Sequence, residues 1–547
     1  TAGEYFEKLH QNVENTTGYL HTWDDELYFE NHRGTYTSQA YNKRMNRRME
    51  GKMQVLEAMA VLAARKGAAV EQDATRSIWE TIMINQFHDI IPGSSISEVY
   101  ADCHKDYTRI AQQAQEMTVR YASHLIGKEE NWYSVWNASV FEREDMVLVP
   151  ESRDGYFEEE NGARLSAQKT AEGWMVRVPV LGFAFASFRF VPAENVQNSL
   201  PFIVNLAEKT IETPFYVVKF GPSGEMISLF DKQNNREVLK EHGNRLIAYM
   251  DRPIMFDAWN IDYDHYTRFE IVDDLQSFEL EYEGGISCVL RLSWKYNKST
   301  ITQRIVFYAD NRRIDFDTKA DWHEQHRLLK ADFSMDIHAH RATYDIQFGN
   351  LERNTHHSTS WDWAKFEVCA HKWIDLSEHG YGVALLNNCK YGHSVCNGHM
   401  AISLIKCATW PAPDADQGEH AFMYSLLPHA GGWREAGVHQ QGEWINQPLT
   451  AMAGRASETN KRLIWVNSDE VSVDAIKPAE DGNGFIVRMH EYQGGHTHVR
   501  IGSDYAAMQL TPVNMLEETM GGTCNTDDFE TTMRPYQICN YRVQWGN

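Results

Sequence analysis

The sequence lacks several features that would place it in other classes of protein. No stretch of 18 consecutive apolar residues occurs, so the sequence predicts no membrane-spanning helix. The chain begins at Thr1 with a polar, helix-like segment and shows neither a signal peptide nor an initiator methionine, so we expect it to be part of a longer polypeptide. Eight cysteines in 547 residues are too sparse for a disulfide framework. They predict buried thiols in a reducing compartment and a cytoplasmic location.

Positive charge is also scarce. The chain has 52 Lys and Arg against 76 Asp and Glu, a net charge of -24. Because nucleic acids and anionic membranes bind basic surfaces, this balance argues against both as partners. A hydrophobic content of 42% is enough to bury several cores, and the length predicts three or four domains.

Apolar periodicity predicts three helices early in the chain. In the first, apolar residues recur every three or four positions from Tyr41 until Gly67 ends the pattern. The second is predicted over 73–89 and is ended by Pro92. The third starts at Ser95–Glu98, whose serine and glutamate have the spacing of a capping box.

After the helices the pattern changes to short alternating strands separated by turns, which is typical of β-sandwiches. The predicted fold class is a multidomain α + β protein, a three-helix bundle followed by β-sandwich domains. The expected divisions are a tail and cleft loop (1–37), the bundle (38–128), a small β-sandwich (129–200), a large β-sandwich (201–450) and a C-terminal β domain (451–547).

The segment Asn85–Gly93 is the first candidate site. A histidine followed by an aspartate, His88-Asp89, stands where the second predicted helix breaks before proline. An imidazole at a helix end can project outward and bind zinc, with the carboxylate orienting it or binding substrate. From spacing alone, a capping or packed histidine is the simpler interpretation.

The second candidate is the loop Asp24–Ser38, just before the first helix. It combines acids, a His-Arg pair, a turn glycine and hydroxyl groups, which could hydrogen-bond a polyol. The alternative is a helix-entry loop in which Thr37 or Ser38 is the cap.

These two segments together closely resemble glycoside hydrolase family 38, the α-mannosidases, in its cytosolic, vacuolar and bacterial branch. Motifs in the same order continue the resemblance over essentially the whole chain. They include Lys43-Arg44-x-Asn46-Arg47, Asp251-Arg252-Pro253, Gly380–Asn387, Asp416-x-Gly418-x-His420 and Pro428-His429.

The resemblance implies a zinc-dependent retaining enzyme that removes terminal α-linked mannose from oligosaccharides or glycans, often as a homo-oligomer. By position, His88 matches the family's last zinc ligand and Asp89 the adjacent active-site acid, and His32 matches a sugar-contacting position. Glu30 and Arg33 are further candidates for the cleft wall. His420, in a loop with Asp414 and Asp416, is a candidate for the β side of the cleft.

The chain also departs from the family pattern. Family members carry a His-x-Asp zinc pair, a nucleophilic aspartate and a second acid–base aspartate in an N-terminal α/β domain, and we find no counterpart of that domain here. Residues 1–37 would then be the tail of the catalytic region. We expect no catalytic residue in this chain, an incomplete zinc site, and no activity without the N-terminal domain of the same polypeptide.

A second cluster of cysteine and histidine residues superficially resembles a zinc site. Cys389, His393, Cys396 and His399 have the spacing C-x3-H-x2-C-x2-H, which we interpret as a turn between strands.

Two other functions are compatible with the composition. One is a non-catalytic carbohydrate-binding β-sandwich module, and the other is a structural scaffold for oligomerisation.

Overall fold

The computed structural model describes residues 1–20, 22–24, 26–27, 32–194, 200–506, 508–526 and 528–545. The chain forms two compact units, Thr1–Glu30 and Asn31–Asn547. In the first, helix α1 (Ala2–Glu14) starts with a capping box between Thr1 and Glu4, and its side chains are exposed.

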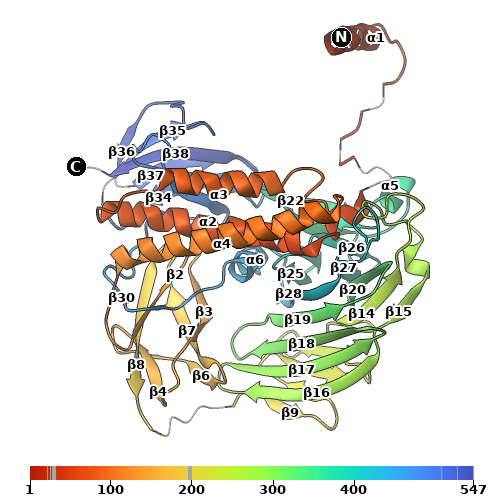
Figure 1. Cartoon of the computed structure of the whole chain (residues 1–547), viewed down its shortest axis with the longest axis horizontal. Coiled ribbons are helices and arrows are strands. Elements are labelled where there is room, and N and C mark those ends of the chain that lie inside the picture. The colour runs from red at the N-terminus through yellow and green to blue at the C-terminus, as the bar shows by residue number, and fades with distance from the viewer. Residues whose placement is uncertain are drawn as a thin grey trace. The chain divides into compact units, whose positions relative to one another are not determined.

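Three long helices form the bundle that the periodicity predicts: α2 (Ala40–Arg65), α3 (Gln72–Asn85) and α4 (Ser97–Leu125) (Figure 1). In the apolar stripe of α2, Met49, Met53 and Leu56 are fully buried. The hydrophobic cluster that contains this stripe continues into the C-terminal strands through residues such as Val487 and Val543. The bundle and the C-terminal sheets therefore share one core.

Two predicted helix boundaries were wrong. Helix α3 ends at Asn85, not at Asp89, because the N–H of Phe87 bonds to the carbonyl of Ile84 in a tighter turn. The capping box expected from Ser95 and Glu98 does not form. The helix α4 begins at Ser97, and its N-cap is Ile96, which has no side-chain cap.

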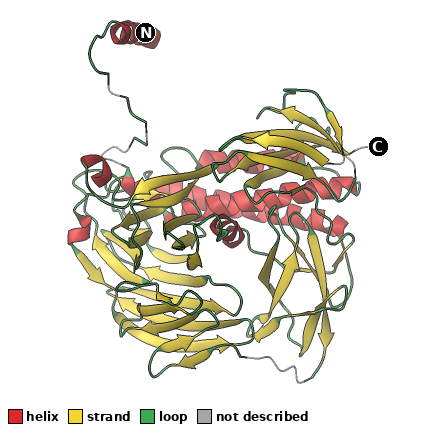
Figure 2. Ribbon diagram, turned by 180° about the vertical axis from the view of Figure 1, so that it is seen from behind, coloured by secondary structure: helices red, strands yellow, loops and turns green. Residues whose placement is uncertain are grey.

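Two large antiparallel sheets form the central β region (Figure 2). In the described ranges the larger has nine strands, in the order β16 (Asp274–Glu283), β17 (Ser287–Tyr296), β18 (Ser299–Tyr308), β19 (Ile314–Trp322), β28 (Gly418–Ala430), β25 (Tyr381–Asn387), β24 (Trp373–Glu378), β21 (Arg341–Ile346) and β22 (Gly349–Asn354). The other has six, in the order β15 (Phe269–Ile271), β14 (Arg245–Met250), β20 (Arg327–Ser334), β27 (His399–Lys406), β26 (Gly392–Cys396) and β23 (Val368–Cys369). The burial of alternate residues in β17 and β18 fits sheets that face a core on one side.

Smaller sheets flank this region. One is β13 (Arg236–Glu237), β12 (Met226–Asp231), β11 (Tyr216–Phe220), β10 (Thr210–Glu212) and β9 (Ile203–Asn205). The small sandwich pairs β29 (Met452–Ala453), β2 (Trp132–Trp136), β8 (Phe185–Pro192), β4 (Gly155–Glu159) and β5 (Arg164–Leu165) with β3 (Arg143–Val149), β7 (Gly173–Val180) and β6 (Ala167–Thr170) around one core.

The C-terminal sheets complete the fold. One is β31 (Trp465–Val466), β34 (Thr497–Gly502) and β37 (Asp528–Met533); the other is β32 (Val471–Pro478), β33 (Phe485–Glu491), β38 (Ile538–Trp545), β35 (Met508–Val513) and β36 (Cys524–Thr526). Strands β1 (Ile126–Gly127) and β30 (Arg455–Ala456) form a two-stranded pair, and the short helices are η1 (Arg33–Tyr36), η2 (His265–Thr267), α5 (Ser360–Trp363) and α6 (Val438–Asn446). The α + β fold class, a helical bundle with β-sandwich domains, is confirmed.

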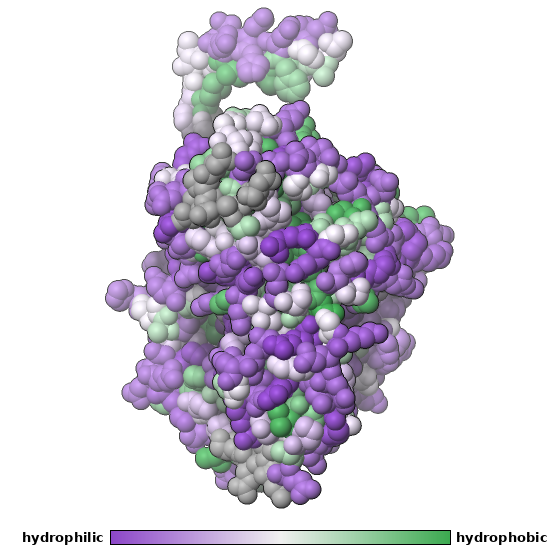
Figure 3. Space-filling view, turned by 90° about the vertical axis from the view of Figure 1, so that its left-hand side faces the viewer, coloured by the Kyte–Doolittle hydropathy of each residue, from purple (hydrophilic) through white to green (hydrophobic). Residues whose placement is uncertain are grey.

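Among the described residues, the helices are all too short or too polar to cross a membrane. The face drawn in Figure 3 is mostly hydrophilic, with hydrophobic residues in small separate patches. The sequence likewise contains no stretch of 18 consecutive apolar residues.

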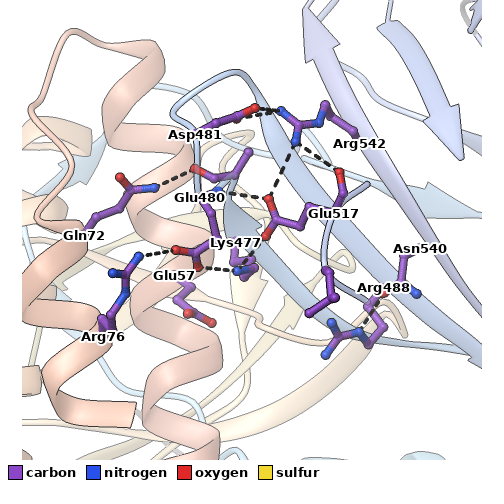
Figure 4. Close-up of polar contacts among 12 residues, drawn as sticks. Glu57, Gln72, Arg76, Lys477, Glu480, Asp481, Arg488, Glu517, Asn540 and Arg542 are labelled. Carbon is purple, nitrogen blue, oxygen red and sulfur yellow. Dashed lines mark hydrogen bonds and ion pairs between the residues drawn. The ribbon is translucent and has the colours of Figure 1, made fainter. Parts of the chain in front are cut away.

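A polar network joins α3 to the C-terminal sheets (Figure 4). Arg76 of α3 pairs with Glu480 at 2.7 Å, and Lys477 of β32 bridges Glu480 and Glu517, each at 2.8 Å. Glu57 of α2 is drawn beside this network, but it is only 6% exposed. Burying the carboxylate of Glu57 therefore costs free energy, whereas Arg76, Lys477, Glu480 and Glu517 are in ion pairs.

We expect the substitution Glu57→Gln to stabilise the protein above neutral pH. Burial raises the pKa of Glu57 from its ordinary 4.5 to about 7, so the folded state holds a proton that the unfolded state releases. Stability from this group is complete below the ordinary pKa and is lost as the pH rises through about 7. The amide oxygen of the substituted glutamine would still accept the hydrogen bond of Trp79 Nε1, which is now 2.9 Å from Glu57 Oε1.

Urea unfolding at pH 8 should show a gain of about 2–3 kcal/mol for this variant, and little or no gain at pH 4.5. The matched control is Glu80→Gln on the exposed face of α3. An equal gain at both pH values, or the same gain in the control, would show that Glu57 is not held protonated by burial.

Candidate functional site

His88 lies in the turn that follows α3, with its side chain 77% exposed. Its Nε2 is 3.4 Å from Asp89 Oδ2, and the Asp89 side chain is 47% exposed. The ring of Phe87 lies 4.2 Å from the imidazole, centroid to centroid. The exposure expected of both His88 and Asp89 is confirmed, and the imidazole is accessible to a ligand or to another domain.

The turn that carries His88 is held on both sides. Gly93 has a φ of 91° and packs so closely on Ser38 that a Cβ there would come within 2.4 Å of the Ser38 carbonyl. The ammonium of Lys43 donates to the carbonyls of Ser38 and, at 2.8 Å, Ile91, and burial lowers its pKa to about 7. Ser94 Oγ donates to Asp89 Oδ1 at 3.2 Å. These contacts hold the backbone of the turn, while the imidazole of His88 remains exposed.

His32 begins the segment against which this turn packs. It has a φ of 81°, its side chain is exposed, and its N–H donates to Asn260 Oδ1 at 3.0 Å. The next residues continue the attachment, because Gly34 N–H donates to the Trp259 carbonyl at 2.7 Å and Ser38 Oγ to the Ala258 carbonyl at 2.7 Å. Residues 32–38 are therefore fastened along 258–260.

The structure gives Arg33 a packing role. Its side chain is buried, its Nε and Nη2 donate to the carbonyl of Ala364 at 3.0 and 2.8 Å, and its guanidinium lies 4.7 Å from the centre of the Phe366 ring. A substrate contact by Arg33 stays a prediction. Glu30 lies outside the described residues.

Asp416 was not recognised from the sequence as the residue that caps α2. One carboxylate oxygen accepts from the N–H of Gln39 and the other from that of Ala40, each at 2.7 Å. Neither Thr37 nor Ser38 is the N-cap; Gln39 is, with a φ of 58° and no side-chain cap of its own. The sequence signal was present as Asp416-x-Gly418-x-His420, but spacing alone could not pair it with a helix 376 residues earlier.

His420 is attached to the same feature. Its Nε2 lies 2.9 Å from the Asp416 carbonyl, so this nitrogen carries the proton, and burial lowers the pKa of the imidazole. His420, Asp414 and Asp416 line a pocket of about 330 Å³ together with Gln39 and other residues at the starts of α2 and α4. Its role as a substrate-binding residue stays a prediction.

The two candidate segments share a larger cavity of about 1070 Å³. Thr35 and Tyr36 line it from the first segment, and Gln86, Ile91 and Pro92 line it from the second. Exposed apolar side chains lie on the second segment, at the helix ends beside it, and in the loops 254–256 and 407–417: Met83, Ile84, Phe87, Ile96, Ile254, Met255, Phe256 and Trp410. Exposed apolar side chains of this kind suit contact with another domain.

One imidazole and one carboxylate cannot enclose a zinc ion, which takes four ligands in closed sites and three protein ligands in catalytic ones. His88 and Asp89 alone therefore do not fit a complete zinc site. Within the described ranges, the residues that gather as possible metal ligands are His242, Asp332 and His399. His393, from the C-x3-H-x2-C-x2-H spacing, is buried. Its Nδ1 forms a hydrogen bond with the Tyr391 carbonyl at 3.0 Å.

Three family models match consecutive parts of the chain. They are described as the alpha mannosidase middle domain, over residues 30–125, the glycosyl hydrolases family 38 C-terminal domain, over 211–414, and the family 38 C-terminal beta sandwich domain, over 470–541. The first contains His32 and His88, and its match agrees with the bundle and the loop before it.

Curated relatives match almost the whole chain. Alpha-mannosidase G of Dictyostelium discoideum is 31% identical over 99% of this chain and 54% of its own length. Alpha-mannosidase 2C1 of Homo sapiens is 31% identical over 97% of this chain and 51% of its own. The chain therefore spans about half the length of the curated relatives it matches.

A solved structure of an α-mannosidase from Enterococcus faecalis V583 has the same fold. It superposes with a TM-score of 0.81 over 99% of this chain and 72% of that one, at 15% identity. The family models and the relatives together support the assignment of this chain to the glycosyl hydrolase family 38 α-mannosidases.

Proposed function

We propose that this chain is one portion of a zinc-dependent retaining α-mannosidase that removes terminal α-linked mannose from oligosaccharides or glycans. The observation that carries the proposal is the imidazole of His88, which is 77% exposed on a turn that the Gly93–Ser38 contact and the Lys43–Ile91 hydrogen bond hold in place. A histidine with only a packing role would be expected to be buried or bonded, as His393 is.

In this proposal the chain supplies one zinc ligand, His88, and a wall of the substrate cleft that includes Asp89 and His32. The nucleophile and the acid–base group belong to residues outside this chain. Three observations support this division: the chain spans about half of its relatives, His88 and Asp89 do not complete a metal site, and apolar side chains are exposed around them. A cytoplasmic location is also proposed, because eight cysteines in 547 residues are too sparse for a disulfide framework.

The test compares two polypeptides on an aryl α-mannoside. The 547-residue chain alone should give no turnover, and a polypeptide that adds the N-terminal region found in the relatives should hydrolyse the substrate with retention of anomeric configuration. A strong chelator should abolish this activity, and added zinc should restore it. Turnover by the chain alone would refute the proposed division of the active site. If a chelator leaves the activity of the longer polypeptide unchanged, the proposed dependence on zinc is refuted.

A further inference from the structure

Three side chains that are far apart in the sequence meet at one end of the sheet that contains β14, β20 and β27. Asp332 belongs to β20, His399 is the first residue of β27, and His242 lies in the loop before β14. Asp332 Oδ1 is 2.7 Å from His242 Nε2 and 3.4 Å from His399 Nδ1. The three groups offer ligand atoms that all lie within 4.8 Å of one another.

The backbone fixes each of these residues. The carbonyl of His242 accepts from the N–H of Ser334 at 2.7 Å, which holds the loop against β20 two residues beyond Asp332. His399 stands directly opposite Ser334 in the pairing of β20 with β27. It follows the turn Asn397-Gly398, in which both residues have positive φ and which Met335 N–H anchors through the carbonyl of Gly398 at 2.8 Å. Ligands on such elements are pre-positioned.

The cluster is partly closed to solvent. His242 and Asp332 are buried, whereas the side chain of His399 is 43% exposed. The nitrogen of His242 that faces Asp332 is Nε2; its Nδ1 is the other ring nitrogen and has no hydrogen-bond partner among the described residues.

Two imidazoles and one carboxylate are the donor set that divalent zinc accepts in proteins, with bonds of about 2.0–2.2 Å. Bonds of that length set neighbouring ligand atoms roughly 3.3 Å apart in a tetrahedral site. The 3.4 Å separation already meets this spacing, the 2.7 Å one would have to lengthen, and the ligand atoms of the two imidazoles lie within 4.8 Å of each other. The side chain of His399 is 43% exposed, so a water molecule from that side would be the fourth ligand.

We propose that His242, Asp332 and His399 form a structural binding site for a zinc ion. The ion would join the loop 240–244 to strands β20 and β27 and would replace the direct hydrogen bonds of Asp332. The ligands come from residues other than His88 and Asp89, so this site does not depend on the proposed mannosidase function. The alternative is an ordinary ion-pair cluster in which Asp332 accepts from both imidazoles.

Equilibrium dialysis against micromolar zinc separates these alternatives. All proteins carry His88→Ala, so that the proposed catalytic site contributes nothing. This background protein should bind one equivalent of zinc, and the additional changes His399→Ala and Asp332→Asn should each weaken binding by at least about 30-fold. The half-exposed His399 tolerates alanine best, and circular dichroism confirms folding before each titration.

The matched control is His338→Ala. His338 and His340 are exposed, their rings are 5.4 Å apart, and they could bind zinc adventitiously. The His338→Ala variant should still bind the equivalent of zinc that the His399→Ala variant loses. Added zinc should raise the Tm of the background protein but not that of the His399→Ala variant. Binding that is unchanged in His399→Ala, or that is lost equally in His338→Ala, would overturn the site. If Asp332→Asn fails to fold, the comparison of His399→Ala with His338→Ala decides alone.

Discussion

The substitution His88→Ala should abolish mannosidase activity in the polypeptide that carries this chain while leaving its stability nearly unchanged. If the imidazole is a zinc ligand, its loss should cost more than the 10–100-fold typical of residues that only support a ligand, so we expect a decrease in kcat/KM of about 10³-fold or more. Because the side chain is 77% exposed, its removal should change the free energy of unfolding by less than about 0.5 kcal/mol.

The measurement is hydrolysis of an aryl α-mannoside, combined with zinc content after dialysis and a thermal melt. His124→Ala, at an exposed position in the last turn of α4, is the matched control and should keep full activity. A His88→Ala enzyme that keeps more than about a tenth of the activity at normal zinc content would exclude His88 as a ligand. Loss of activity together with a collapsed melting curve would instead indicate a packing role.

The features that the sequence predicted well depend on local periodicity. The stripe from Tyr41 to Gly67 became α2, and alternating segments such as Ile301–Tyr308 became strands, because side-chain spacing reports directly on which face is buried. The exposure of His88 was also predictable, since the helix had to break before Pro92. The exact end of α3 was not, because it depends on which of two competing turns the backbone of residues 84–87 adopts.

The features that were missed all depend on contacts between distant parts of the chain. The contacts of Arg33 with the Ala364 carbonyl and the Phe366 ring could not be predicted from the sequence, because more than 300 residues separate these groups along the chain. His399 was noticed only in a cysteine-histidine spacing, whereas its neighbours in the fold are His242 and Asp332. No local pattern specifies such pairings, since they follow from strand order and register.

Asp416→Ala should be among the most destabilising single substitutions in the chain. Asp416 is buried, and its two oxygens accept from the first free N–H groups of α2, where a negative charge is also favoured by the helix dipole. Alanine would leave two buried donors unpaired, at about 1–3 kcal/mol each, and would hold the backbone at a φ of 55°, which alanine disfavours. We expect the free energy of unfolding to fall by about 3–5 kcal/mol.

Thermal melts and hydrogen exchange of residues 40–65 would measure this loss, which should appear first in the bundle because Asp416 caps α2 there. Asp416→Asn keeps one acceptor and suits a positive φ, so it should lose only about 1–2 kcal/mol. The control is Asp414→Ala in the same loop, where an exposed carboxylate accepts from Ser97 Oγ and little should change. Equal losses at the two positions would mean that the loop as a whole, and not the carboxylate of Asp416, stabilises α2. A graded series from alanine to asparagine to aspartate would establish that a residue of the β region fixes the start of the helix against which the His88 turn packs.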